Sequence, residues 1–355
     1  MNTWGSKLKI SIFGESHGEG IGVILDGIPS GLGLDKEFIC REMNRRAPGK
    51  SKLSTPRKEA DEVEILSGVM NQKTTGTPIC GIIRNTNTRS QDYTPNLLRP
   101  GHADFTGFQK YGKTHDFRGG GHFSGRITAP LVFAGAIAKL ALAQEGITVG
   151  SHIRSIHGIC EESFLDISLS KELLQNISQK EFPVINDSTG QKMQTEILNA
   201  AANKDSVGGI IECAALGVNP GFGSPFFASV ESLISSMMFS IPAVKGIQFG
   251  KGFDFCDMTG SEANDPFQTD GKNIYTTTNN NGGINGGITN GMPIIFSVAV
   301  KPTPSIGMEQ QTVDTDKMEN TTIKINGRHD PCIVQRAAVV VESAAALAIL
   351  ESKLI

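Results

Sequence analysis

The sequence predicts an α+β fold with an internal pseudo-twofold duplication. Expected strands and helices alternate along the chain, and two long loops, 85–128 and 254–292, fall in its two halves. Sequence matches recur in the same order: GIPSGLG (27–33) with GVNPGFG (217–223), VEILSGV (63–69) with IQFGKGF (247–253), and TGTPI (75–79) with NGMPI (290–294). Chance matching of glycine-rich turns is the alternative. We expect one domain, 1–355, with pseudo-repeats at about 7–150 and 206–353, whose long loops share a site.

The individual elements follow from apolar periodicity and its boundaries. Alternating or short apolar runs predict strands at 7–13, 21–25, 63–69, 78–84, 147–153, 206–216, 244–249 and 293–300. Amphipathic or apolar stretches predict helices at 35–46, 129–144, 170–181, 190–204, 225–239 and 333–353. Asp35 is a suitable N-cap for the first helix, and Pro48-Gly49 ends it.

Composition narrows the class of protein. The 355 residues carry a net charge of -3, which gives no global reason to expect nucleic acid or a membrane surface. Six scattered cysteines without a CxxC pair fit a reducing compartment. The N-terminus has no apolar signal core, and Lys139 and Glu342 interrupt the longest apolar runs. We therefore expect a cytoplasmic protein without a membrane span.

The segment 99–128 carries an unusual set of side chains. It contains three histidines, five cationic residues opposed by two aspartates, and seven glycines, and it shows no continuous helical or strand period. Its five aromatic residues argue against disorder. We expect an ordered loop that places cations and imidazoles around an anionic ligand.

A second basic cluster follows the first expected helix. Its members are Arg41, Arg45, Arg46, Lys50, Lys52, Arg57 and Lys58. Arg41 and Arg45 are four residues apart and share a helix face. A solvated surface is one interpretation, and nucleic-acid binding is disfavoured because residues 41–58 contain no aromatic side chain for stacking. A small ligand with phosphate and carboxylate groups suits forked guanidiniums better.

The sequence GESHG (14–18) matches the G-x-S-x-G pattern of serine hydrolases. A strand precedes it, but the following residues predict a second strand where that pattern needs a helix. A hydrolase using Ser16 is therefore an alternative with weak support. A glycine-rich hairpin that exposes His17 is the structural alternative.

Two further motifs carry polar groups close to helix starts. GGGHFSGR (119–126) could form an anion-binding nest of backbone N–H groups, or serve only as a flexible hinge. GRHDPC (327–332) precedes the last helix, where Asp330 and Pro331 also suit a helix start. No histidine pair has metal-ligand spacing on one element, so we expect no metal site.

Taken together, the motifs resemble those of the chorismate synthase family. The matching stretches are GESHG (14–18), RRAPG (45–49), RSQDY (89–93), RPGHAD (99–104), KYG (110–112), DFRGGG (116–121), SGRITA (124–129), KPTPS (301–305) and GRHDPC (327–332). They span nearly the whole chain in family order. The resemblance implies a β-α-β sandwich and a homotetramer.

The resemblance also implies an activity, that of a carbon–oxygen lyase acting on phosphates. The family converts 5-enolpyruvylshikimate 3-phosphate to chorismate and phosphate by an anti-1,4-elimination, the last step of the shikimate pathway, which leads to the aromatic amino acids. Reduced FMN is required without net redox change. NADPH would serve only as an indirect reductant, and a separate flavin reductase is a possible partner, because no complete dinucleotide fingerprint is present.

Residue roles carry over by position. The resemblance implies His102 as the acid near the leaving phosphate, His17 as the residue that protonates or steadies reduced flavin, and Asp330 as a carboxylate near flavin N5. Arg46 and Lys52 match positions for a phosphorylated ligand, NADP in some members, and we group Arg41 and Arg45 with them. Implied flavin contacts are His122, Phe123, Ser124, Pro242, Ala243, Gly286, Lys301, Pro302, Thr303, Pro304, Ser305 and Arg328.

Four positions depart from the commonest family pattern. His122-Phe123 replaces Arg-Ser, Lys52 replaces Arg, and Pro242 replaces Asn. Backbone contacts to a flavin would survive these changes, whereas side-chain contacts at 122 and 242 would differ. Lys52 keeps the charge but loses the bidentate fork of arginine.

Overall fold

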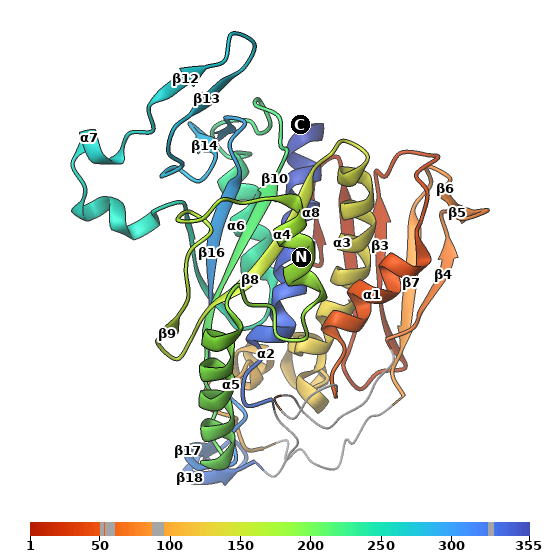
Figure 1. The fold of residues 1–355 in the computed structure, drawn as a ribbon. Helices are drawn as coiled ribbons and strands as arrows, with labels where there is room; N and C mark the ends of the chain where they lie inside the picture. The colour runs from red at the N-terminus through yellow and green to blue at the C-terminus, as the bar shows by residue number, and fades with distance from the viewer. Residues whose placement is uncertain (50–52, 54–60, 87–95, 326–329) are drawn as a thin grey trace.

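The computed structural model describes residues 1–49, 53, 61–86, 96–325 and 330–355. Its centre is a layer of helices between two five-stranded antiparallel sheets (Figure 1). The first sheet has the order β1-β2-β3-β7-β4, with bounds Thr3–Trp4, Lys9–Gly14, Gly20–Asp26, Ile79–Arg84 and Val63–Ser67. The second has the order β11-β16-β10-β8-β9, with bounds Val244–Phe249, Ile294–Val300, Gly209–Leu216, Thr148–Ile156 and Ile159–Cys160.

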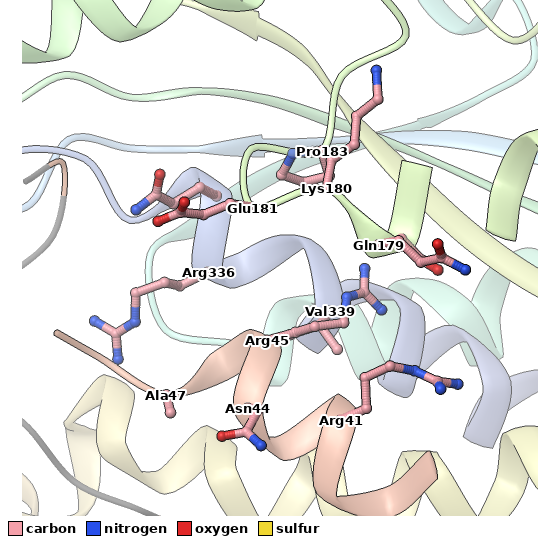
Figure 2. Close-up of a pocket in the computed structure, with 12 residues that line it drawn as sticks. Arg41, Asn44, Arg45, Ala47, Gln179, Lys180, Glu181, Pro183, Arg336 and Val339 are labelled. Atoms are coloured by element: carbon pink, nitrogen blue, oxygen red, sulfur yellow. The ribbon is translucent and has the colours of Figure 1, made fainter. Parts of the chain in front are cut away.

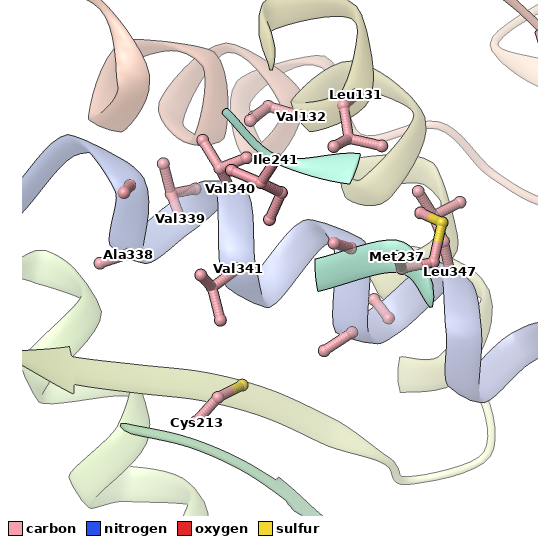
Figure 3. Packing of buried hydrophobic residues seen from close by; sticks show 14 of the residues in the cluster. Leu131, Val132, Cys213, Met237, Ile241, Ala338, Val339, Val340, Val341 and Leu347 are labelled. Carbon is pink, nitrogen blue, oxygen red and sulfur yellow. The ribbon is translucent and has the colours of Figure 1, made fainter. Parts of the chain in front are cut away.

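Four helices fill the layer between the sheets. They are α1 (Lys36–Arg46), α3 (Thr128–Ala143), α6 (Val230–Ser240) and α8 (Val334–Leu354). Both α3 and α8 are buried almost all round, which is why apolar residues occupy all their faces and do not form a single stripe. Figure 3 shows Leu131 and Val132 of α3 close to the valines of α8, with Cys213 of β10 on the far side. The two sheets therefore share one hydrophobic core.

The two sheets repeat one topology. Each half runs strand, strand, helix, strand, strand, helix: β2, β3, α1, β4, β7, α3 and then β8, β10, α6, β11, β16, α8. When the second sheet order is read in reverse, β8, β10, β16 and β11 take the places of β2, β3, β7 and β4. The predicted duplication requires this match. Strand β8 begins the second sheet, so by topology the second half starts near residue 148, inside the range expected for the first repeat. The boundaries of the repeats themselves stay a prediction.

The remaining elements lie outside this sandwich. Helices α4 (Lys171–Gln179) and α5 (Asp187–Ala202) pack near β8 on the outer side of the second sheet (Figure 1). Short strands pair as β5 (Val69–Met70) with β6 (Lys73–Thr74), β12 (Phe267–Thr269) with β13 (Ile274–Thr276), β14 (Ile284–Asn285) with β15 (Ile288–Thr289), and β17 (Glu309–Asp314) with β18 (Glu319–Lys324). Helix α7 spans Gly260–Ala263, and 3-10 turns span Gly112–Thr114, Arg118–Phe123, Gly125–Ile127 and Gly252–Asp257.

Most predicted elements are confirmed, with four corrections. The segment 99–128 is not irregular throughout, because α2 spans Asp104–Tyr111. The helix expected from residue 225 begins at Val230, where the Ser229 side chain caps it. The hairpin β17–β18 was not predicted, and the loop 254–292 contains α7 and two small hairpins.

Buried charges join the helices to each other and to the sheets. Glu342 of α8 accepts two hydrogen bonds from Arg45 of α1, both at 2.7 Å, and one from Ser151 of β8 at 2.8 Å. Lys139 of α3 bridges Glu342 and Glu42. Burial raises the pKa of Glu342, but Arg45 and Lys139 outweigh it and lower that pKa to about 2. The network fixes the relative positions of α1, α3 and α8.

The last turn of α8 reaches the start of the first sheet. Glu351 accepts hydrogen bonds from the backbone N–H groups of Ser6 and Leu8, each at 2.6 Å. In the part of the chain that the structure describes, one helical stretch, Gly125–Ala143, is long and apolar enough to cross a membrane; 83% of its window is buried inside the protein, as in a core helix.

Candidate active site

The turn 14–18 and the glycine-rich residues 119–121 lie against each other at one end of the sandwich. The Ser16 N–H donates to the Gly121 carbonyl at 3.1 Å, and His122 Nδ1 lies 2.8 Å from the Gly14 carbonyl oxygen. The Asn85 amide donates to the carbonyls of Glu15 and Gly18, both at 3.0 Å. These bonds join the loop of one half of the chain to the first hairpin.

Strand β3 begins at Gly20, directly after this turn. A serine-hydrolase elbow needs a helix at that point. The turn therefore connects two antiparallel strands, and the hydrolase interpretation loses its structural basis.

Two imidazole rings pack on consecutive glycines. A Cβ atom at Gly119 would lie 2.5 Å from His17 Nε2, and a Cβ atom at Gly120 would lie 3.1 Å from His102 Nε2. Both glycines have positive φ, +61° and +86°. Because adjacent Cα atoms are about 3.8 Å apart, the two rings share one small region. The structure thus brings together the two predicted catalytic histidines, and only glycine fits between them.

Two buried hydroxyl groups lack a hydrogen-bond partner among the described residues. They are Ser16 Oγ, beside Gly119, and Thr303 Oγ1 in the run 301–305. A buried hydroxyl without a partner costs about 1–3 kcal/mol, so such atoms are suited to contact a polar ligand. Thr303 lies in the run expected to contact flavin. The donors at these positions fit an oxygen-rich, anionic ligand.

The run 301–305 lies beside the loop that carries His102. Lys301 Nζ donates to the Gly101 carbonyl at 2.6 Å, and a Cβ atom at Gly101 would lie 3.2 Å from Pro304 Cβ. The Lys301 N–H donates to the Ala243 carbonyl at 2.9 Å, which brings 242–243 to the same place. Ser305 is buried. Residues 242–243 and 301–305 therefore lie beside the loop that carries His102, and their contact with a flavin stays a prediction.

Gly286 lies elsewhere in the chain. It sits in the turn between β14 and β15, and its neighbour Gly287 accepts a hydrogen bond from Val230 at the start of α6. Ala243 and Lys301 follow the other ends of α6 and β16. Figure 1 shows β14 at one end of the second sheet and α2, which follows His102, at the other. The seven residues of β16 alone span roughly 20 Å, so Gly286 does not join the other predicted residues within one chain.

Asp330 lies next to the start of α8, where Arg336 holds it. Arg336 Nη1 donates to Asp330 Oδ2 at 2.6 Å, and Arg336 Nε donates to the Arg46 carbonyl at 2.9 Å. Arg336 therefore fixes the carboxylate relative to the end of α1.

Arg46 is directed into the protein. Its side chain is 2% exposed and lies 3.2 Å from Asp61, which also pairs with Arg126. Arg46 Nη1 donates to the Arg126 carbonyl at 3.2 Å, and Arg126 Nε donates to Asn85 Oδ1 at 3.0 Å. The two arginines thus share one buried aspartate that supports the loops of the candidate site.

Arg41 and Arg45 line a separate pocket of about 330 Å³. Figure 2 shows both arginines and Asn44 on α1, with Gln179 to Pro183 across from them and Arg336 on α8. The pocket has more basic than acidic side chains. Most of its cations already have partners: Arg45 pairs with Glu342, Arg336 with Asp330, and Lys180 with Asp187. Neither His17 nor His102 is among the residues that line this pocket.

The other predicted residues have these places. Phe123 packs near Tyr111, with ring centroids 6.3 Å apart, and Ser124 Oγ accepts from the Arg126 N–H at 3.3 Å. Lys52 and Arg328 lie outside the described residues. Within the described ranges, no group of three or more His, Cys, Asp or Glu side chains could hold a metal ion.

Sequence reasoning missed two residues that contact a predicted catalytic group. Arg99 and Asp104 both hydrogen-bond at the His102 ring. The signal was present as the H-x-D spacing within RPGHAD (99–104). Ser16 was considered only as a hydrolase nucleophile, and Asp61 was missed as a site residue. Asp61 carried no local signal, because its partners Arg46 and Arg126 are distant in the sequence.

This architecture defines a class: a two-sheet α+β protein whose paired imidazoles, buried hydroxyls and basic loop suit proton transfer to a small anion. The family model described as chorismate synthase matches residues 8–354. The chain belongs to the chorismate synthase family, and so to enzymes of the lyase class.

Individual members of this family match nearly the whole chain. The chain is 47% identical to a chorismate synthase of Dehalococcoides mccartyi over 96% of this chain and 93% of the relative. It is 46% identical to that of Parabacteroides distasonis, covering 100% and 98%. A solved structure described as a crystal structure of chorismate synthase superposes with a TM-score of 0.76 at 31% identity, covering 98% and 92%. The predicted family and fold are confirmed.

Proposed function

We propose that this chain converts 5-enolpyruvylshikimate 3-phosphate to chorismate and phosphate. A proton leaves C6, the C3–O bond breaks with its electron pair going to the phosphate oxygen, and two conjugated ring double bonds result. The observation that supports this most is the packing of His17 and His102 on Gly119 and Gly120. It concentrates two proton-transfer groups in one small region.

His102 is the proposed acid for the leaving phosphate. Phosphate leaves poorly with its full developing charge, so a proton donor at the bridging oxygen lowers the barrier. Arg99 and Lys301 lie around the same loop and add positive charge there. Asp330, held by Arg336, is the carboxylate proposed to assist removal of the C6 proton.

Reduced FMN is the proposed cofactor, and the residues present fit it. Thr303 Oγ1 and Ser16 Oγ are buried hydroxyls without a partner among the described residues, and 119–121 form a cradle that a Cβ atom would fill. His122, Phe123, Ser124, Ala243 and the run 301–305 would hold it. When bound, reduced flavin supplies the electron-rich ring on which the family's reaction depends. NADPH remains a proposed indirect reductant that acts through a separate flavin reductase.

A homotetramer is the proposed assembly. Gly286 belongs to the expected flavin contacts but lies at the opposite end of the second sheet from Lys301. A second copy can supply Gly286 to the site, whereas one chain cannot. Light scattering of the purified protein should give a mass near four times 37.9 kDa, and a monomer that turns over at full rate would contradict this proposal. We expect the enzyme to be cytoplasmic.

The deciding experiment is an anaerobic assay with purified full-length protein, the proposed substrate and chemically reduced FMN. Inorganic phosphate and chorismate should appear in equal amounts. Oxidised FMN with NADPH should give no product until a flavin reductase is added. Absence of phosphate release with reduced FMN would refute the proposed function.

A further inference from the structure

Arg99, His102 and Asp104 form one hydrogen-bonded group at the start of α2. Arg99 binds the Asp104 carboxylate as a fork, with Nε at 2.8 Å from Oδ2 and Nη2 at 2.6 Å from Oδ1. The Arg99 N–H adds a third bond to Oδ2 at 3.0 Å. Asp104 Oδ1 lies 2.8 Å from His102 Nδ1. All three side chains are largely buried, at 9–16% exposure, so little water competes for these bonds.

The geometry determines which His102 nitrogen carries the fixed proton. Burial raises the pKa of Asp104, but the hydrogen bonds from His102 and Arg99 outweigh it and hold that pKa well below its usual range. An ionised carboxylate can only accept hydrogen bonds. His102 Nδ1 must therefore be the donor at 2.8 Å. Arg99 Nη2, 3.2 Å from Nδ1, already donates to Asp104 at the shorter distance.

The opposite edge of the ring is the one that can exchange a proton. Among the described residues, His102 Nε2 has no hydrogen-bond partner, and it faces Gly120. Among the described residues, the charged or titratable groups near the ring include Arg99, Asp104, His17 on Gly119 and, one residue along the loop, Lys301 at the Gly101 carbonyl. A neutral ring would present a bare Nε2, and a protonated ring would present an Nε2–H donor.

We propose that Arg99 and Asp104 are a positioning pair that keeps the exchangeable proton of His102 on Nε2, at the Gly120 face. This rests on the proposed function of His102 as a proton donor. Asp104 orients the ring through Nδ1, and Arg99 holds Asp104 in place. Neither residue needs to touch the substrate.

The test uses Asp104→Asn, which keeps the shape of the side chain but removes its charge. The first readout is solid-state NMR of the full-length protein with 15N-labelled histidine, with His102 assigned by its absence in His102→Gln. Wild-type His102 should be protonated at Nδ1 at pH 8, and the variant should lose that preference, because an amide can also donate to the ring. A bare Nδ1 in the wild type would overturn the inference.

The second readout is the split between kcat and KM. We expect Asp104→Asn to lower kcat roughly 10–100-fold at pH 7 and to leave KM nearly unchanged, because Asp104 acts through His102 and does not touch the substrate. A kcat equal to that of the wild type, or a rise in KM as large as the loss of kcat, would also overturn the inference. Asp187→Asn, which breaks the exposed pair with Lys180 at 2.7 Å, is the control and should change neither readout.

The proposed function and the proposed position of the His102 proton are tested independently. If the wild type releases no phosphate, the proposed function is wrong, whereas the NMR result still decides the position of the His102 proton.

Discussion

His102 and His152 are both bound by carboxylates, yet they suit opposite tasks. His152 is fully buried in the second sheet, with Nδ1 2.5 Å from Glu161 and Nε2 2.9 Å from Glu212. Among the described residues, His102 has a carboxylate at Nδ1 and none at Nε2, which faces a glycine. A histidine that is bound at both nitrogens links strands, whereas one bound at a single nitrogen can exchange a proton. Proximity to a carboxylate alone therefore does not identify a catalytic histidine.

The largest expected effect is a loss of turnover when His102, the proposed proton donor, is replaced. We expect His102→Ala to lower kcat by roughly 10²–10⁴-fold, because a positioned proton donor is lost. Thermal unfolding should change less than in a variant of His152, since Arg99 still binds Asp104 when the His102 ring is removed. Steady-state phosphate release measures the first effect and calorimetry the second. An unchanged kcat would remove His102 from the mechanism.

The complementary variant is His152→Ala. It leaves Glu161 and Glu212 buried without their shared cation, which typically costs about 3–5 kcal/mol. Urea titration should show this loss, while kcat of the folded fraction stays near the wild-type value. A large loss of kcat with unchanged stability would contradict a structural role for His152.

A smaller effect should come from Gly120→Ala, with Gly31→Ala as its matched control. Both glycines have positive φ, +86° and +87°, so each alanine should lose about 1–2 kcal/mol of stability. An added Cβ meets His102 at 3.1 Å in the first case and nothing within 4 Å in the second. Only Gly120→Ala should therefore lower kcat. Equal kcat values for the two variants would show that the close contact is unimportant.

The pH dependence of stability should distinguish the buried histidine. Burial lowers the pKa of His152, but the hydrogen bonds from Glu161 and Glu212 outweigh it and raise the pKa above 6.5. A raised pKa contributes stability that is complete below the unfolded-state pKa and is lost as pH rises through the folded-state pKa. Unfolding of wild type and His152→Gln from pH 6 to 10 should therefore converge at high pH. A constant difference would refute a charged His152.

The sequence revealed local features far better than distant partners. Helix α1 was predicted to within one residue, because Asp35 caps it and Pro48 ends it nearby. Helix α2 was missed, because its glycine and aromatic residues obscure the apolar period. His17 and His102 were assigned through local motifs, and the structure brings them together.

The cationic residues show most clearly that local sequence does not reveal long-range ion pairs. Arg41 and Arg45 were predicted to share a face, and both do line one pocket. The strong pairing of Arg45 with Glu342 spans 297 residues and has no signature in either local sequence. The pairing of Arg46 and Arg126 with Asp61 likewise has no signature in the local sequence. Long-range ion pairs decide which arginines remain available for a ligand, and single-sequence patterns do not contain them.

The bonds from Glu351 to the amides of Ser6 and Leu8 have a consequence for biosynthesis. The start of the first sheet receives this partner only after residue 351 has left the ribosome. Until then the nascent chain has no α8, so the apolar surface of α3 lacks its main cover. The core therefore closes only once α8 has emerged, and chains that stop before α8 expose surface that chaperones and proteases recognise.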